Sequence, residues 1–469
     1  MSQINKPTPI QLPINYSQGP NIPVKLGKTK ADFWLEDAGG NRFKDLKQID
    51  VLGTQLLHPK DRVHLSISGV PPHDIMRASI NGKAFIQFSG QDPVECLKHD
   101  NDDTRSTWVP LLEPLDVAQS LGSGTRIEFV LFGFPVFYGE QDTRVQTTSS
   151  DNETTGWWRC GQIEIKCGQW HIQISAHDKT KEWNEAIKRT GGLAATHAGC
   201  IQKKDSEEIS WDGAQNIITC LHHFLSFARG HWQPLGHIRL LSNDGACLHE
   251  RWGILRGSDQ LTQSSLTWWS PHPQAHQLSD VFKGFLELWN DPSWKDALPE
   301  LIYWYLQANL AGRGHLGADS ALTLSQATLE KLAWFYATQV RKAVSEEAFR
   351  PGKLRASDQL RLLATLMGLP HEVPDILDSL KEDAKGLKFE DAFHAVTEIR
   401  NQLVHSKKKR ELKPGAEFEA WNLSQWYVEM CLLRLMHYQG QYANRVRLNK
   451  WVGETEAVPW AAVAGGESV

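Results

Sequence analysis

The sequence lacks the features that mark membrane, secreted and disulfide-stabilised proteins. No run of about 18 or more uninterrupted apolar residues is present, so we expect no membrane-spanning helix. The amino terminus has no cationic start followed by an apolar stretch, so we expect no export signal and a cytoplasmic protein. The 7 cysteines lie far apart and include no C-x-x-C pair, which argues against a disulfide framework.

An excess of positive charge is also missing. Lys and Arg total 50 against 55 Asp and Glu, which gives a net charge of −5. A protein that coats nucleic acid along its whole length is normally basic, so the charge balance excludes that class. A local basic patch remains compatible with this balance.

Metal and nucleotide motifs are weak or absent. Cys220 lies near His222 and His223, but no second paired set of ligands accompanies them, so we predict neither a metal nor a cofactor. A G-x-G-x-x-G string at Gly312, Gly314 and Gly317 follows a predicted helix rather than a strand, which indicates a loop between helices. The sequence contains no G-x-S-x-G, H-E-x-x-H or P-loop.

The first part of the chain has the pattern of a β protein. Residues 1–28 contain five prolines and are predicted to form an extended arm. Residues 29–277 are predicted to form a β-rich sensor or regulatory domain, with short alternating strands typical of an antiparallel sandwich or barrel. Hairpin turns are expected at Asn81-Gly82 and at 167–169, and surface loops at 101–106 and 139–156. A break near residue 177 would divide this region, so one and two subdomains both stay open.

From residue 278 onward the apolar spacing is helical. The predicted helices include 320–345, 389–406 and 417–439, and we predict one α-helical domain over 278–469. The fold class is therefore α+β multidomain, with a β-sandwich-like amino-terminal body followed by an all-α bundle.

The candidate catalytic and binding side chains are concentrated in residues 389–415. In the predicted helix, Phe389, Phe393, Val396, Ile399 and Leu403 have the spacing of a buried face. The other notable residues are Arg400, Asn401 and His405, with the cationic strip Lys407, Lys408, Lys409 and Arg410 directly after them.

This group suits RNA cleavage without a metal. A histidine that titrates near neutrality can accept the proton of the ribose 2′-hydroxyl, and a guanidinium can hold the phosphate as charge builds. Asn401 would orient either group, and the strip at 407–410 would bind the phosphodiester backbone. The spacing alone also fits an ordinary surface helix in which Arg400 pairs with Glu398 or Asp391.

R-N-Q-L-V-H at 400–405 resembles the R-x4-6-H motif of HEPN domains, with a polar residue after the arginine. The helical context, residues 307–336 and V-P-W at 458–460 are most similar to the ApeA-like HEPN group of bacterial anti-phage defence proteins. The resemblance covers roughly residues 278–460. It implies a homodimeric, metal-independent endoribonuclease in which Arg400 and His405 are catalytic and Asn401 assists. Many HEPN proteins in phage defence are toxins that cut host RNA, often transfer RNA, once infection is sensed.

We therefore expect an endoribonuclease toxin of antiviral, abortive-infection defence whose substrate is RNA, with a phage-derived trigger acting on the β-rich domain. The alternative is a non-catalytic HEPN module that dimerises and uses its β-rich body to bind a viral or host partner. In that case Arg400 and His405 would be buried in salt bridges. A small-molecule sensor built on the 19 tryptophans of the chain would be compatible with either function, although these residues more simply indicate aromatic anchors in several cores.

Overall fold

The structure is a computed structural model of the chain. It describes residues 10–12, 16–57, 62–101, 105–118, 122–137, 142–149, 152–159, 161–257, 266–271, 276–313, 317–350, 352–404, 412–447, 450–451 and 453–461. These residues belong to two compact units. The first comprises residues 1–222 and 233–263, and the second residues 223–232 and 264–469.

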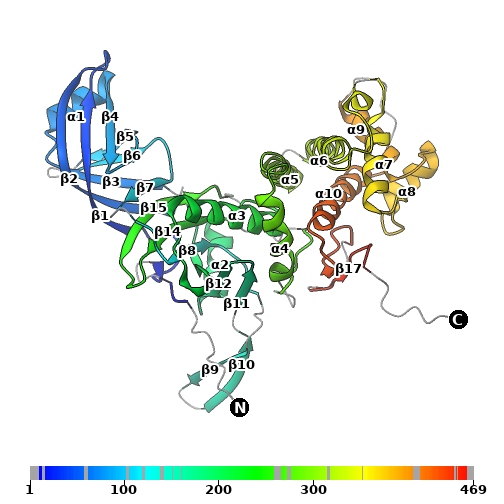
Figure 1. Ribbon diagram of the computed structural model, residues 1–469, viewed down its shortest axis with the longest axis horizontal. Coiled ribbons are helices and arrows are strands. Elements are labelled where there is room, and N and C mark those ends of the chain that lie inside the picture. Colours follow the sequence, from blue (N-terminus) through cyan, green and yellow to red (C-terminus); the bar gives the residue numbers. More distant parts are fainter. Residues whose placement is uncertain are drawn as a thin grey trace. The chain divides into compact units, whose positions relative to one another are not determined.

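The first unit opens with a closed barrel of six antiparallel strands in the order β1-β2-β3-β6-β5-β4 (Figure 1). Alternation places Val63, Leu65 and Ile67 of one strand inside, all fully buried, as expected for a barrel interior. The strands are β1 (Val24–Glu36), β2 (Arg42–Leu56), β3 (Arg62–Ser68), β4 (Lys83–Phe88), β5 (Val94–Asn101) and β6 (Arg105–Pro110).

A helix, α1 (Pro72–Asn81), separates β3 from β4, so the hairpin predicted at Asn81-Gly82 is wrong. Proline at the start and Asp74 in the first turn favour a helix, and Gly82 ends it by donating its backbone N–H to the carbonyl of Ala78. The loop predicted at 139–156 is also wrong in part. It contains most of the hairpin of β9 (Asp142–Ser149) and β10 (Asn152–Arg159), whose strands lack the apolar alternation that marks a half-buried strand.

A separate antiparallel sheet of seven strands completes the first unit, in the order β11-β12-β13-β8-β14-β15-β7. The turn predicted at 167–169 is confirmed, because Cys167 pairs with Trp170 and Gly168 has the positive φ that a tight turn requires. The strands are β7 (Leu115–Ala118), β8 (Arg126–Phe132), β11 (Gln162–Cys167), β12 (Trp170–Ala176), β13 (Ala195–Lys203), β14 (Leu235–Leu241) and β15 (Cys247–Leu255).

Trp252 on β15 joins the sheet to the barrel within this unit. The ring is fully buried, and a Cβ placed on Gly53 of β2 would lie 2.5 Å from it, so only glycine fits there. The first unit also contains α2 (Thr180–Thr190) and the first part of α3 (Trp211–Arg229), whose residues from 223 onward belong to the second unit. Ser210 is the N-cap of α3, since its hydroxyl accepts the backbone N–H of Gly213.

The second unit is largely helical. A two-stranded ribbon follows the last helix (Figure 1). The elements are α4 (His276–Asn290), α5 (Ala297–Arg313), α6 (Gly317–Trp334), α7 (Ala356–Met367), α8 (Asp378–Leu387), α9 (Ala392–Val404), α10 (Ala416–Leu435), β16 (Gln441–Tyr442) and β17 (Glu456–Ala457).

The helix predicted over 320–345 ends as an α-helix at Trp334 and continues as a π-helical segment, Phe335–Val340. In that segment the backbone N–H of Arg341 bonds to the carbonyl of Tyr336, five residues back. The G-x-G-x-x-G string lies where predicted, at the junction of α5 and α6, with Gly314 outside the described residues.

The α+β class is confirmed, with a β-rich amino-terminal region and a largely helical carboxyl-terminal region. The β-rich region contains a closed barrel and a separate seven-stranded sheet. The predicted sandwich-like body did not separate these two parts. Within the part of the chain that the structure describes, no helix is both long and apolar enough to span a lipid bilayer.

Candidate functional site

Helix α9 carries the predicted catalytic arginine and is anchored at its start by Asp391. One carboxylate oxygen of Asp391 accepts the backbone N–H of His394, and the other lies 2.5 Å from Nε of Arg361 on α7. Phe393, Val396 and Ile399 are buried as predicted. The anchored start and the buried stripe together fix the direction in which the last turn of α9 presents its polar side chains.

Arg400 lies in the last turns of α9 and is half-buried, with 23% of its side chain exposed. Its Nη1 donates a hydrogen bond of 3.1 Å to Oδ1 of Asn401, the next residue of α9. Its Nε is fully buried and has no acceptor among the described residues. An unmet buried donor of this kind costs on the order of 1–3 kcal/mol.

The counter-charge of Arg400 is not the one suggested by sequence proximity. Nη2 lies 3.7 Å from Oε1 of Glu330 on α6, which is 31% exposed. That same oxygen accepts a hydrogen bond of 2.7 Å from Nε2 of the fully buried Gln326, one turn earlier on α6. Asp391 instead pairs with Arg361. The acidic partner of Arg400 therefore comes from another helix. The spacing of residues 389–415 gives no information about that partner.

The remaining predicted site residues fall outside the part of the chain that the structure describes. These are His405 and the strip Lys407, Lys408, Lys409 and Arg410. The described portion of α9 ends at Val404, whose side chain is 52% exposed. The structure thus brings Arg400 and Asn401 together, and the geometry of His405 relative to them stays a prediction.

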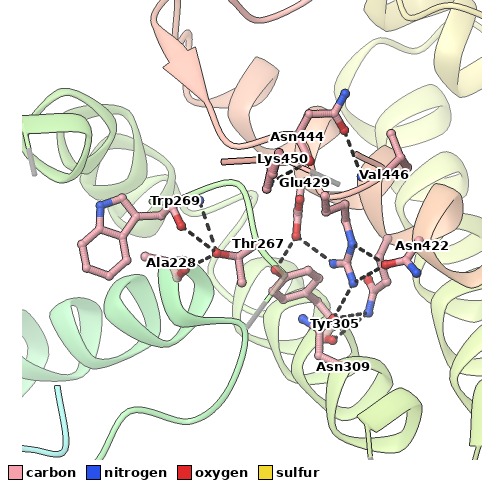
Figure 2. Close-up of polar contacts among 12 residues, drawn as sticks. Ala228, Thr267, Trp269, Tyr305, Asn309, Asn422, Glu429, Asn444, Val446 and Lys450 are labelled. Atoms are coloured by element: carbon pink, nitrogen blue, oxygen red, sulfur yellow. Dashed lines mark hydrogen bonds and ion pairs between the residues drawn. The ribbon is translucent and has the colours of Figure 1, made fainter. Parts of the chain in front are cut away.

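A second polar constellation in this unit is fully buried and was missed by the sequence analysis. Arg445, on the returning segment, donates from Nη1 to Oε1 of Glu429 at 2.8 Å and from Nη2 to Oδ1 of Asn309 at 3.0 Å. Both members of the Arg445–Glu429 ion pair are 0% exposed. Figure 2 shows Tyr305, Asn309, Asn422 and Glu429 converging between the helices.

Burial raises the pKa of Glu429, and the nearby Arg445 and a hydrogen bond of 2.6 Å from the hydroxyl of Tyr305 oppose that shift. The second carboxylate oxygen of Glu429 has no partner among the described residues. Because an isolated buried charge is so costly, this network fastens the segment around Arg445 to α5 and α10. A lone arginine beyond the last helix gives no sequence signal of this role.

A third titratable group lies in the seven-stranded sheet. His237 occupies a bulge of β14 with a φ of 50°, a left-handed conformation that is unusual for histidine. Its Nδ1 lies 3.7 Å from Oε1 of the buried Glu250, and the ring of Tyr16 packs against it at 4.8 Å. Burial lowers the pKa of His237 to about 3 and raises the pKa of Glu250. At neutral pH His237 is therefore uncharged.

Cys220 and His222 lie close together in the sequence and are possible metal ligands by residue type. Cys220 is buried, and burial raises the pKa of its thiol. His222 is hydrogen-bonded through Nε2 to the carbonyl of Arg256 at 2.8 Å. The described residues contain no group of three or more potential metal ligands from His, Cys, Asp and Glu.

Two regions of the chain match known families. Residues 121–262 match the family described as YopA central domain, and residues 291–457 match the family described as YopA C-terminal domain. A similar protein is the SPbeta prophage-derived uncharacterized protein YopA of Bacillus subtilis (strain 168), 24% identical over 312 residues. The similarity covers 64% of this chain and 66% of that protein. No solved structure matches the chain.

Proposed function

We propose that this YopA-family chain is a metal-independent endoribonuclease of antiviral defence, with Arg400, Asn401 and His405 at its active site. The observation that carries the proposal is the state of Arg400. Asn401 holds one edge of its guanidinium, its Nε lacks an acceptor among the described residues, and its acidic neighbour lies beyond hydrogen-bond length. Because 23% of the side chain is exposed and the carboxylate makes no hydrogen bond to it, the guanidinium has donor capacity left for a phosphate.

The proposed reaction follows from these groups. His405 takes the proton of the ribose 2′-hydroxyl as its oxygen attacks the adjacent phosphorus. Arg400 binds the non-bridging phosphate oxygens as charge accumulates on them. The bond from phosphorus to the 5′-oxygen breaks, and a second protonated histidine gives its proton to that oxygen. The products are a 2′,3′-cyclic phosphate and a free 5′-hydroxyl.

A two-fold dimer supplies the second histidine, because a symmetric interface brings the same residues from two copies into one cleft. Apolar side chains on the two helices that carry Arg400 and Glu330 support this arrangement. Val404 at the end of α9 and Trp334 at the end of α6 are both partly exposed, at 52% and 36%. In the proposed dimer the partner copy would cover these two side chains.

Three features of the proposal come from the resemblance to ApeA-like HEPN proteins. They are the transfer RNA substrate, the phage-derived trigger and control by the amino-terminal region. The Bacillus subtilis relative is prophage-derived by name, so we place the activity in competition between phages and their hosts. The strip at 407–410 supplies the cationic surface that an RNA backbone requires in a chain of net charge −5.

The test is incubation of the purified full-length protein with total RNA and transfer RNA in excess EDTA, beside Arg400→Ala and His405→Ala. We expect discrete fragments from the parent and none from either variant, with the melting temperature of each variant unchanged. Cleavage by both variants, or unfolding of both, would mean that the motif is not catalytic.

One observation favours a second function, a non-catalytic module that dimerises and binds a partner through its β-rich region. Arg400 is half-buried and has a carboxylate neighbour, as expected if it has a structural role. In that case Arg400→Ala would destabilise the helical unit and leave RNA intact in every assay. Neutralising the lysines at 407–409 would then have no effect on partner binding.

A further inference from the structure

We propose that Glu330 is an internal competitor for the phosphate site, holding Arg400 in a resting state until RNA or an activating event displaces it. This inference concerns the regulation of the proposed active site and therefore rests on the proposed function. It is carried by the geometry of α6 and α9, because Oε1 of Glu330 lies 3.7 Å from Nη2 of Arg400.

Glu330 is held in place toward Arg400. Nε2 of Gln326 donates to the same oxygen of Glu330 that faces the guanidinium, and Gln326 is fully buried on α6. The amide thus fixes the rotamer of the carboxylate without neutralising it. A side chain oriented by a buried neighbour in this way loses less entropy when it forms an ion pair.

The distance between Glu330 and Arg400 is short enough for electrostatic attraction and too long for a hydrogen bond. At 3.7 Å the two groups form an ion pair without a hydrogen bond, and Nε of Arg400 remains unfilled among the described residues. A phosphate that reached Arg400 would offer shorter, charge-assisted hydrogen bonds. The same phosphate would be repelled by Glu330 at this distance. Glu330 therefore weakens RNA binding for as long as it stays beside Arg400.

This arrangement differs from a purely supporting role, and the two make opposite predictions. If Glu330 competes with phosphate, Glu330→Gln removes the repulsion, keeps the shape and strengthens RNA binding and cleavage. If Glu330 only positions Arg400, the same change weakens both. Because the ion pair is partly exposed, we expect its loss to change RNA binding and cleavage by about two- to fivefold.

The experiment compares the parent, Glu330→Gln, Glu330→Gln/Arg400→Ala and the control Glu382→Gln. Glu382 is exposed and forms an ion pair of 3.1 Å with Lys413, so its substitution removes the same charge from the same unit. RNA affinity and single-turnover cleavage are measured at one low salt concentration. We expect a gain of about two- to fivefold for Glu330→Gln alone. A loss in Glu330→Gln, or an equal gain in the double variant, would overturn the proposal.

A second readout does not depend on catalysis. Phenylglyoxal reacts with accessible arginine side chains, and a carboxylate paired with the guanidinium slows the reaction. Mass spectrometry can follow the modification of Arg400 alone. We expect faster modification of Arg400 in Glu330→Gln than in Glu382→Gln, with protection by inorganic phosphate. An unchanged rate would overturn the proposal even if RNA is cut. Faster modification with no cleavage by any variant, even in extract from phage-infected cells, would leave the competition in place and refute the nuclease.

Discussion

Replacing Arg445 by methionine tests the buried network of the helical unit. The guanidinium contributes hydrogen bonds to Glu429 and Asn309, and no part of it reaches solvent. Removing one member of a buried ion pair typically costs about 3–5 kcal/mol, because the other charge stays buried without compensation. We expect Arg445→Met to lower the free energy of unfolding of this unit by that amount at pH 8. Urea titration followed by circular dichroism measures it.

The loss of stability in Arg445→Met must depend on pH, and the protonation of Glu429 determines the direction of that dependence. Burial already raises the pKa of this carboxyl, and loss of Arg445 raises it further. At a pH below its pKa in the folded state, the Glu429 carboxyl is protonated, so it has no buried charge that needs a partner. The destabilisation in Arg445→Met should therefore shrink as the pH falls from 8 toward 5 and grow as the pH rises.

A double substitution separates the charge from the packing. Glu429→Leu combined with Arg445→Met removes both charges, so we expect the double variant to be more stable than Arg445→Met alone. If the two single losses simply add, or if Arg445→Met costs less than about 1 kcal/mol at pH 8, the network does not stabilise the unit and the reasoning fails.

Two further predictions concern local packing and titration. Gly312→Ala should destabilise the helical unit by about 1–3 kcal/mol, because its Cβ would lie 2.3 Å from the buried ring of Trp421. The matched change Gly386→Ala, with nothing within 4 Å, should gain about 0.5–1 kcal/mol; equal urea midpoints for the two would contradict this. The lowered pKa of His237 means that its contribution to stability is lost as the pH falls from about 6.5 toward 3. The raised pKa of Glu250 has the opposite effect on the pH dependence of stability, so the test compares the parent with His237→Asn. The stability of His237→Asn should fall less on acidification than that of the parent. Parallel curves of stability against pH would refute this prediction.

The order of elements could be predicted because it depends on local periodicity. The apolar stripe of α9, with Phe393 and Ile399 buried, follows from a spacing of three and four residues. The turn at Gly168 follows from a two-residue connection between alternating strands. The strand order of the barrel is not local, because β3 pairs with β6 across more than thirty residues, so it could not be predicted.

Contacts around the candidate site could be anticipated only within one helix. Arg400 and Asn401 are adjacent in sequence, and a hydrogen bond joins their side chains. Their catalytic roles stay predictions. Glu330 approaches Arg400 from α6, where Gln326 of the same helix donates a hydrogen bond to it. The approach of Glu330 to Arg400 depends on how two helices pack. Arg445 lies in an irregular segment, where burial depends on which helices it meets rather than on any pattern in its neighbours.

The most direct test of the central claim uses an RNA oligonucleotide that the parent protein cuts at one position. A matched oligonucleotide carries a single 2′-deoxynucleotide directly 5′ of that position, and both are incubated with the protein in EDTA. Attack by the 2′-hydroxyl predicts 2′,3′-cyclic phosphate ends from the first and no cleavage of the second, with Arg400→Ala inactive on both. Cleavage of the deoxy-substituted strand at the same position would contradict the proposed mechanism.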